Sequence, residues 1–123
     1  MNELRFFFDN LWLWKCNLPE NQPFKIDNPD TLYESEWSPR FEKYMRNRLV
    51  MGALRYGKIN APNKPKYCRV ESMVKRLNQY QKTGNLEILV DVANLCLLEF
   101  EEGNHPNKHF NALCENEHVK VNE

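Results

Sequence analysis

The fold of this chain is decided by residues 86–102, which read LEILVDVANLCLLEFEE. Drawn as a helix, this stretch is apolar on most of its circumference, and a helix of that kind is normally surrounded by protein. Asn85 suits the N-terminal cap and Gly103 suits the end of the helix. The stretch therefore predicts a buried central helix, in which Cys96 is a small core residue.

A first flanking helix is predicted from residue 39 to residue 56. Ser38 and Pro39 favour its start, because serine caps free amides and proline at the first position has no amide to lose. Gly57 supplies a left-handed stop. The spacing of its apolar residues predicts a core face made of Phe41, Tyr44, Met45 and Leu49.

A second flanking helix is predicted over about residues 67–83, closed by Gly84. Its apolar residues recur at helical spacing and predict the face that packs on the core, with Arg69 and Arg76 elsewhere. A further short helix is predicted to open at His105-Pro106. The fold class is therefore all-α, a small helical bundle, and the core face of the second helix is Val70, Met73, Val74, Leu77 and Tyr80.

One domain is predicted for the 123 residues. Residues 1–37 form an aromatic arm and a Pro-containing connector without folded elements, residues 38–115 form the helical core, and residues 116–123 form a frayed tail. The aromatic arm, residues 6–14, is expected to pack on its own core or on a second subunit. Because monomers rarely expose such a patch, the chain is predicted to form a homo-oligomer.

Charge and composition exclude several classes of partner. Lys plus Arg and Asp plus Glu both number 17, so no long-range field attracts DNA, RNA or an anionic membrane. No run reaches the roughly 20 apolar residues of a membrane span. The four cysteines lack metal-ribbon spacing and indicate free thiols in a reducing compartment, so a cytoplasmic location is expected.

Polar residues break the apolar pattern of the central helix on one face. Glu87, Asp91 and Asn94 stand at i, i+4 and i+7. Carboxylates on a buried helix need partners, because an unpaired buried charge costs several kcal/mol, of the order of 3 to 5. The candidate cations are on the two flanking helices: Arg48, Arg55, Arg69 and Arg76.

A glycine between two arginines forms a candidate phosphate site. Arg48, Gly52 and Arg55 share one face of the first flanking helix, and a glycine in mid-helix costs about 1 kcal/mol relative to alanine. Guanidinium groups suit phosphate oxygens, which they grip with two hydrogen bonds. Asn94 would then read a base or ribose. The alternative is that Arg48 or Arg55 only neutralises Asp91 or Glu87 in a salt bridge.

The order of several motifs resembles small helical bacteriophage proteins similar to the all-α nucleoside triphosphate pyrophosphatases, the MazG-like group. The motifs are residues 55–60 (RYGKIN), a helix with Arg69 and Arg76, residues 83–85 (TGN) and residues 87–95 (EILVDVANL). The resemblance covers about residues 38–102. It implies removal of pyrophosphate from a nucleoside triphosphate, with Mg²⁺ held by Glu71, Glu87 and Asp91.

Two alternatives to this enzyme remain open. The Glu-Glu-x-x-Glu cluster of that group has only Glu42 or Glu71 to match it here, and a site with fewer acids would bind metal weakly. The first alternative is a non-catalytic phage-type sponge that binds and sequesters a (cyclic) nucleotide defence signal in the host cytoplasm. The second is a protein-interaction module that acts through the aromatic arm.

Overall fold

The computed structural model describes residues 24, 26–111 and 118–121. Two compact units divide the chain: Ser38–Lys108, and Met1–Trp37 together with His109–Glu123. The described residues contain only helices and no strand, which confirms the all-α fold class. No helix among them is long and apolar enough to cross a membrane. The elements are η1 (Pro29–Thr31), α2 (Leu32–Ser35), α3 (Pro39–Tyr56), α4 (Arg69–Thr83) and α5 (Leu86–Glu102).

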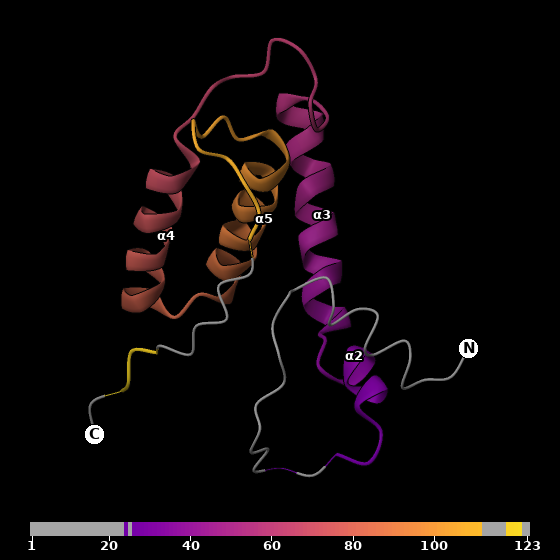
Figure 1. Ribbon diagram of the computed structural model, residues 1–123. Helices are drawn as coiled ribbons and strands as arrows, with labels where there is room; N and C mark the ends of the chain where they lie inside the picture. Colours follow the sequence, from indigo (N-terminus) through magenta and orange to yellow (C-terminus); the bar gives the residue numbers. More distant parts are fainter. Residues whose placement is uncertain (1–23, 25, 112–117, 122–123) are drawn as a thin grey trace. The chain divides into compact units, whose positions relative to one another are not determined.

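Helix α5 is the central helix of the unit Ser38–Lys108, as predicted. It packs against α3 on one side and α4 on the other (Figure 1). Its buried apolar residues are Ile88 and Val90. The prediction for Cys96 is wrong: this thiol is exposed, with its Sγ 3.3 Å from Sδ of Met73, because α5 has neighbours on two flanks rather than all round.

Local chemistry sets the helix ends where the sequence placed them. The Ser38 hydroxyl accepts the amide of Phe41 at 3.1 Å, and Pro39 occupies the first turn of α3. Gly84 ends α4 with φ of 69°, in the left-handed region that glycine enters without strain. The Asn85 side chain then accepts the amide of Glu87 at 3.1 Å and starts α5. Helix α4 begins at Arg69, two residues later than predicted.

The predicted core face of α4 is wrong in part. Val70 and Val74 are each 55% exposed, whereas Arg69 and Arg76 are half-buried. The stripe that is turned inward contains Arg69, Met73, Arg76 and Tyr80. Ion pairs of Arg69 with Glu99 and Glu102 of α5 stabilise this orientation of α4, in which Arg69 and Arg76 are turned toward α5.

Two segments depart from the predicted secondary structure. The connector contains η1 and α2, because Asn28 accepts the amide of Asp30 and Pro29 occupies the first turn. Residues 104–111, the described part of the predicted short helix, contain no helix, and Pro106 and Asn107 form a turn. There His105 Nδ1 accepts the amide of Asn107 at 3.0 Å, which favours a local turn over a helical ladder. The aromatic arm, Cys16 and Cys114 lie outside the described residues, as do residues 116, 117, 122 and 123 of the predicted tail.

Candidate functional site

A cavity of about 780 Å³ lies among α3, α4, α5 and the connection between α3 and α4. We call it the cationic cavity, because six basic side chains and two acidic ones line it in a chain of zero formal net charge. It brings together all five residues predicted to bind nucleotide. The basic residues are Arg48, Arg55, Lys58, Lys64, Arg69 and Arg76, and the acidic residues are Asp91 and Glu102.

Arg48 is the partner of both carboxylates on the predicted polar face. Its Nε donates to Asp91 Oδ1 at 3.2 Å, and its Nη2 lies 3.6 Å from Glu87 Oε1. The Arg48 side chain is 39% exposed and that of Asp91 27%, so the pair contributes on the order of 1 kcal/mol or less. The salt bridge that was the alternative to a phosphate site is therefore present for Arg48, which pairs with Asp91 and Glu87.

Two basic side chains of the cationic cavity make no hydrogen bond or ion pair with any described residue. They are Arg55 near the end of α3 and Lys58 in the loop that follows, and both are exposed. Arg76 makes one contact, from Nη1 to the carbonyl oxygen of Ser72 at 3.4 Å. The positive charge of this part of the cavity is therefore not neutralised by carboxylates of the described chain.

Glu102, the last residue of α5, neutralises two further basic residues of the cationic cavity, Lys64 and Arg69. Its carboxylate accepts Lys64 Nζ at 2.9 Å, Arg69 Nη2 at 2.9 Å and the amide of Asn60 at 2.7 Å. The side chain is only 8% exposed. The Lys64 hydrogen bond holds the pKa of Glu102 below its ordinary value, and Asn60 and Arg69 add to this effect against the opposing influence of burial.

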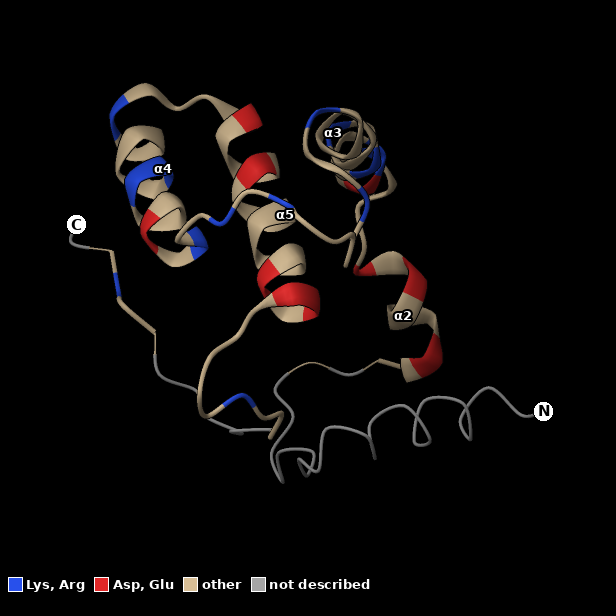
Figure 2. Cartoon of the chain, turned by 90° about the horizontal axis from the view of Figure 1, so that it is seen from above, with Lys and Arg blue, Asp and Glu red and all other residues tan. Residues whose placement is uncertain are grey.

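Glu102 is not among the predicted site residues, although the sequence contains a signal for it. Acidic residues at the C-terminal end of a helix oppose the helix dipole, so they need cations nearby. Glu99, Glu101 and Glu102 stand in the last turn of α5, which contains no basic residue. Acidic residues accordingly lie toward both ends of α5 (Figure 2). Arg69 contacts two of the three, with Nη1 3.7 Å from Glu99 Oε2.

Gly52 lines the cationic cavity together with Arg48 and Arg55, as the candidate phosphate site predicted from the sequence requires. A Cβ added at Gly52 would meet no atom within 4 Å among the described residues. The described structure thus contains no packing reason for a mid-helix glycine that costs about 1 kcal/mol relative to alanine.

Asn94 also lines the cationic cavity, but its contacts connect helices. Its Nδ2 donates to the carbonyl oxygen of Met45 on α3 at 3.0 Å. The residue is 7% exposed, and its Oδ1 is buried without a hydrogen-bond partner. The amide nitrogen is therefore committed to holding α5 against α3, and the oxygen retains a free acceptor.

The three acids predicted to hold Mg²⁺ are not assembled around one point. Glu87 and Asp91 both face Arg48, and Glu71 lies exposed on α4 and lines no cavity described here. No group of three or more His, Cys, Asp or Glu side chains suited to a metal ion occurs in the described part of the chain. Glu42, the other acid considered, accepts Arg46 at 2.9 Å on α3.

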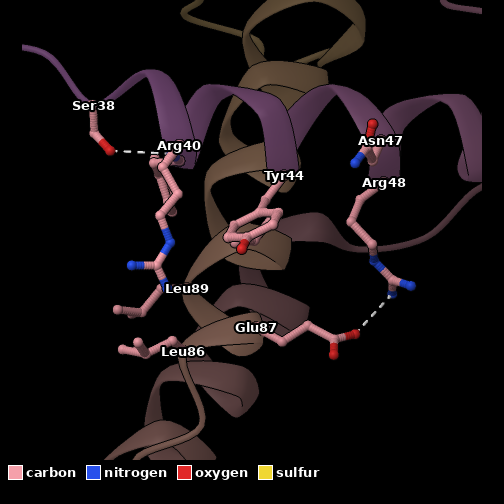
Figure 3. A pocket seen from close by; sticks show the side chains of 10 residues that line it. Ser38, Arg40, Tyr44, Asn47, Arg48, Leu86, Glu87 and Leu89 are labelled. Carbon is pink, nitrogen blue, oxygen red and sulfur yellow. Dashed lines mark hydrogen bonds and ion pairs between the residues drawn. The ribbon is translucent and has the colours of Figure 1, made fainter.

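A second cavity, of about 560 Å³, lies between the first half of α3 and the start of α5 (Figure 3). We call it the aromatic cavity, because Phe41 and Tyr44 line it together with Leu86, Leu89 and Val90. Arg40 stands over the Tyr44 ring, with the guanidinium carbon 5.7 Å from the ring centre. Arg48 lines this cavity as well as the cationic one.

Comparisons of the chain with family models, with curated proteins and with solved structures find no match.

Proposed function

We propose that this protein binds a small phosphorylated nucleotide in the cationic cavity. The observation that carries the proposal is the local excess of positive charge: six basic side chains and two acidic ones surround one cavity in a chain of zero formal net charge. Arginine suits phosphate because its planar fork donates two parallel hydrogen bonds. Arg55 and Lys58 have no carboxylate partner among the described residues, so they are free to meet a phosphate.

Binding without cleavage is the form of this function that the acidic residues support better. A hydrolase of the MazG-like kind would need Glu71, Glu87 and Asp91 to hold Mg²⁺. Glu87 and Asp91 instead face Arg48, and Glu71 stands apart on α4. A phage-type sponge that sequesters a nucleotide signal needs no such ligand set. Hydrolysis is the alternative. Binding to another protein through the aromatic arm and formation of a homo-oligomer stay predictions, because the aromatic arm lies outside the described residues.

Arg55→Ala is expected to weaken nucleotide binding without affecting folding. Loss of a charge-assisted hydrogen bond costs about 1.5 to 3 kcal/mol of binding free energy, or roughly 10- to 150-fold in Kd. Because Arg55 is exposed and makes no hydrogen bond or ion pair with a described residue, the free energy of unfolding should change by less than about 0.5 kcal/mol. Titration calorimetry with ATP and urea denaturation measure the two quantities.

Arg46→Ala is the matched control for this experiment. Arg46 is on the same helix, its side chain is 76% exposed and it lines neither cavity. Its removal should leave ATP affinity unchanged. Equal affinities of wild type and Arg55→Ala, or no binding by a panel of nucleoside phosphates, would refute the proposal. Release of pyrophosphate that requires Mg²⁺ and stops with EDTA would identify the hydrolase instead, whereas recovery of intact nucleotide after heating supports the sponge.

Gly52→Ala is expected to raise stability and lower affinity together. Alanine is favoured over glycine in a helix interior by about 0.5 to 1 kcal/mol, and the added methyl group meets no described atom. The same methyl group would stand where a phosphate approaches α3 between the two arginines. Urea denaturation should show the gain and calorimetry the loss. An unchanged affinity for ATP would show that phosphate does not approach the helix at Gly52.

A further inference from the structure

We propose that the aromatic cavity is the base subsite of the same nucleotide site, so that the ligand is a nucleoside polyphosphate lying along α3. This inference rests on the proposed function. The two cavities share Arg48, which lines both of them. A ligand that contacts Arg48 therefore has access to the aromatic cavity on one side and to the cationic cavity on the other.

The lining of the aromatic cavity suits a flat heterocycle. Its walls are the rings of Phe41 and Tyr44 and the aliphatic side chains of α5. The Tyr44 side chain points from α3 toward α5 (Figure 3), and the residue is 45% exposed. Arg40 stands over the ring at 5.7 Å. Bases stack on such aromatic surfaces, and each stack is worth about 1 to 3 kcal/mol by alanine substitution.

Charge sets the direction of the ligand. The aromatic cavity is lined by two basic side chains, Arg40 and Arg48, and by one carboxylate, Glu87, which lies 3.6 Å from Arg48, so it has an excess of one positive charge. The cationic cavity is lined by six basic side chains and two acidic ones, and it contains Arg55 and Lys58, which have no carboxylate partner among the described residues. The base consequently takes the aromatic cavity and the phosphates take the cationic one.

The length of the site selects the number of phosphates. Tyr44 and Arg55 are on α3 and eleven residues apart in sequence, which is about 16 Å along a helix. Arg48 is only one turn from Tyr44, about 6 Å along the axis. A single phosphate attached to a nucleoside at Tyr44 reaches the region of Arg48, and a chain of phosphates is needed to approach Arg55.

The test compares AMP, ADP, ATP and inorganic pyrophosphate on wild type, Tyr44→Ala and Arg55→Ala by titration calorimetry. Tyr44→Ala should weaken all three nucleotides by a similar factor, about 5- to 150-fold, and leave pyrophosphate affinity unchanged. Arg55→Ala should weaken ATP more than ADP, and AMP least. Tyr44→Phe should retain the affinity of wild type, because it preserves the stacking surface.

Lys43→Ala is the control variant, because Lys43 is an exposed neighbour on α3 that lines neither cavity. If wild type binds ATP and Arg55→Ala weakens it but Tyr44→Ala does not, the base subsite is wrong and the proposed function stands. Equal losses of ATP and pyrophosphate in Tyr44→Ala would also overturn the subsite, because they would show a general disturbance of α3. An Arg55→Ala effect that is the same for AMP and ATP would overturn the orientation along the helix. If wild type binds none of the four ligands, the proposed function is wrong, and the base subsite that rests on it is wrong as well.

Discussion

Replacing Asn94 with Asp is expected to lower the free energy of unfolding by about 2 to 4 kcal/mol at pH 7. The two side chains have nearly the same shape, so packing is retained and only the chemistry changes. The introduced carboxylate would lose the donor that meets the Met45 carbonyl and would lie at a position that is 7% exposed. The carboxyl group avoids the free-energy cost of a buried charge only if it stays protonated, and protonation of an ordinary aspartate at pH 7 costs about 4 kcal/mol.

The destabilisation caused by Asn94→Asp should depend on pH. Burial raises the folded-state pKa of the introduced carboxyl above its unfolded value, so its penalty is full at neutral pH and fades as the pH falls toward about 4. Urea denaturation of the variant and of wild type at pH 7 and at pH 4 measures the difference at each pH. Asn78→Asp, at an exposed position of α4, is the control and should cost less than about 0.5 kcal/mol. A variant as stable as wild type at pH 7 would show that Asn94 is solvated and does not hold α5 against α3.

Glu102→Gln is expected to cost about 2 to 3 kcal/mol at pH 7, because it removes the counter-charge of the half-buried Lys64 and one of the two carboxylates that Arg69 contacts. The side chains of Lys64 and Arg69 are 17% and 22% exposed, and both lie 2.9 Å from the carboxylate. Glutamine has one acceptor oxygen in place of two, so it cannot accept from the Asn60 amide, Lys64 and Arg69 in the way that the carboxylate does. Glu101→Gln is the matched control, because it makes an identical change in net charge at an exposed neighbouring position.

Acid should remove the advantage of Glu102 over glutamine. The folded-state pKa of Glu102 lies below the ordinary value of 4.5, so its stabilising contribution is complete above about pH 4.5 and is lost as the pH falls through the lower value. The difference in unfolding free energy between wild type and Glu102→Gln should therefore shrink between pH 5 and about pH 3. A difference that stays constant over this range would mean that glutamine disturbs packing and not charge.

The positions of the helices could be read from the chain because their ends depend on neighbouring residues. Ser38 and Pro39 start α3, and Gly84 followed by Asn85 separates α4 from α5. Each of these signals acts over three or four residues through a hydrogen bond or a backbone angle. The central position of α5 followed from its composition, because a helix that is apolar on most of its circumference needs neighbours on more than one side.

The candidate site could be predicted only as a set of residues. Helical spacing placed Arg48, Gly52 and Arg55 on one face, and the cationic cavity contains all three. Spacing alone did not decide which arginine meets Asp91, because both arginines share that face. The structure assigns Asp91 to Arg48 at 3.2 Å and leaves Arg55 without a partner among the described residues.

The amino-acid sequence by itself determined the three long helices α3, α4 and α5, most of their ends and which of them is central, because those properties come from local hydrogen bonds and from the apolar pattern of each segment. Only the tertiary structure decided the rotation of α4. The apolar pattern of α4 favoured burial of Val70 and Val74. The ion pairs of Arg69 with Glu99 and Glu102 instead turn the face that contains Arg69 and Arg76 toward α5. These partners are 30 or more positions apart along the chain, and a charge pair at that separation forms only after packing brings the two helices together.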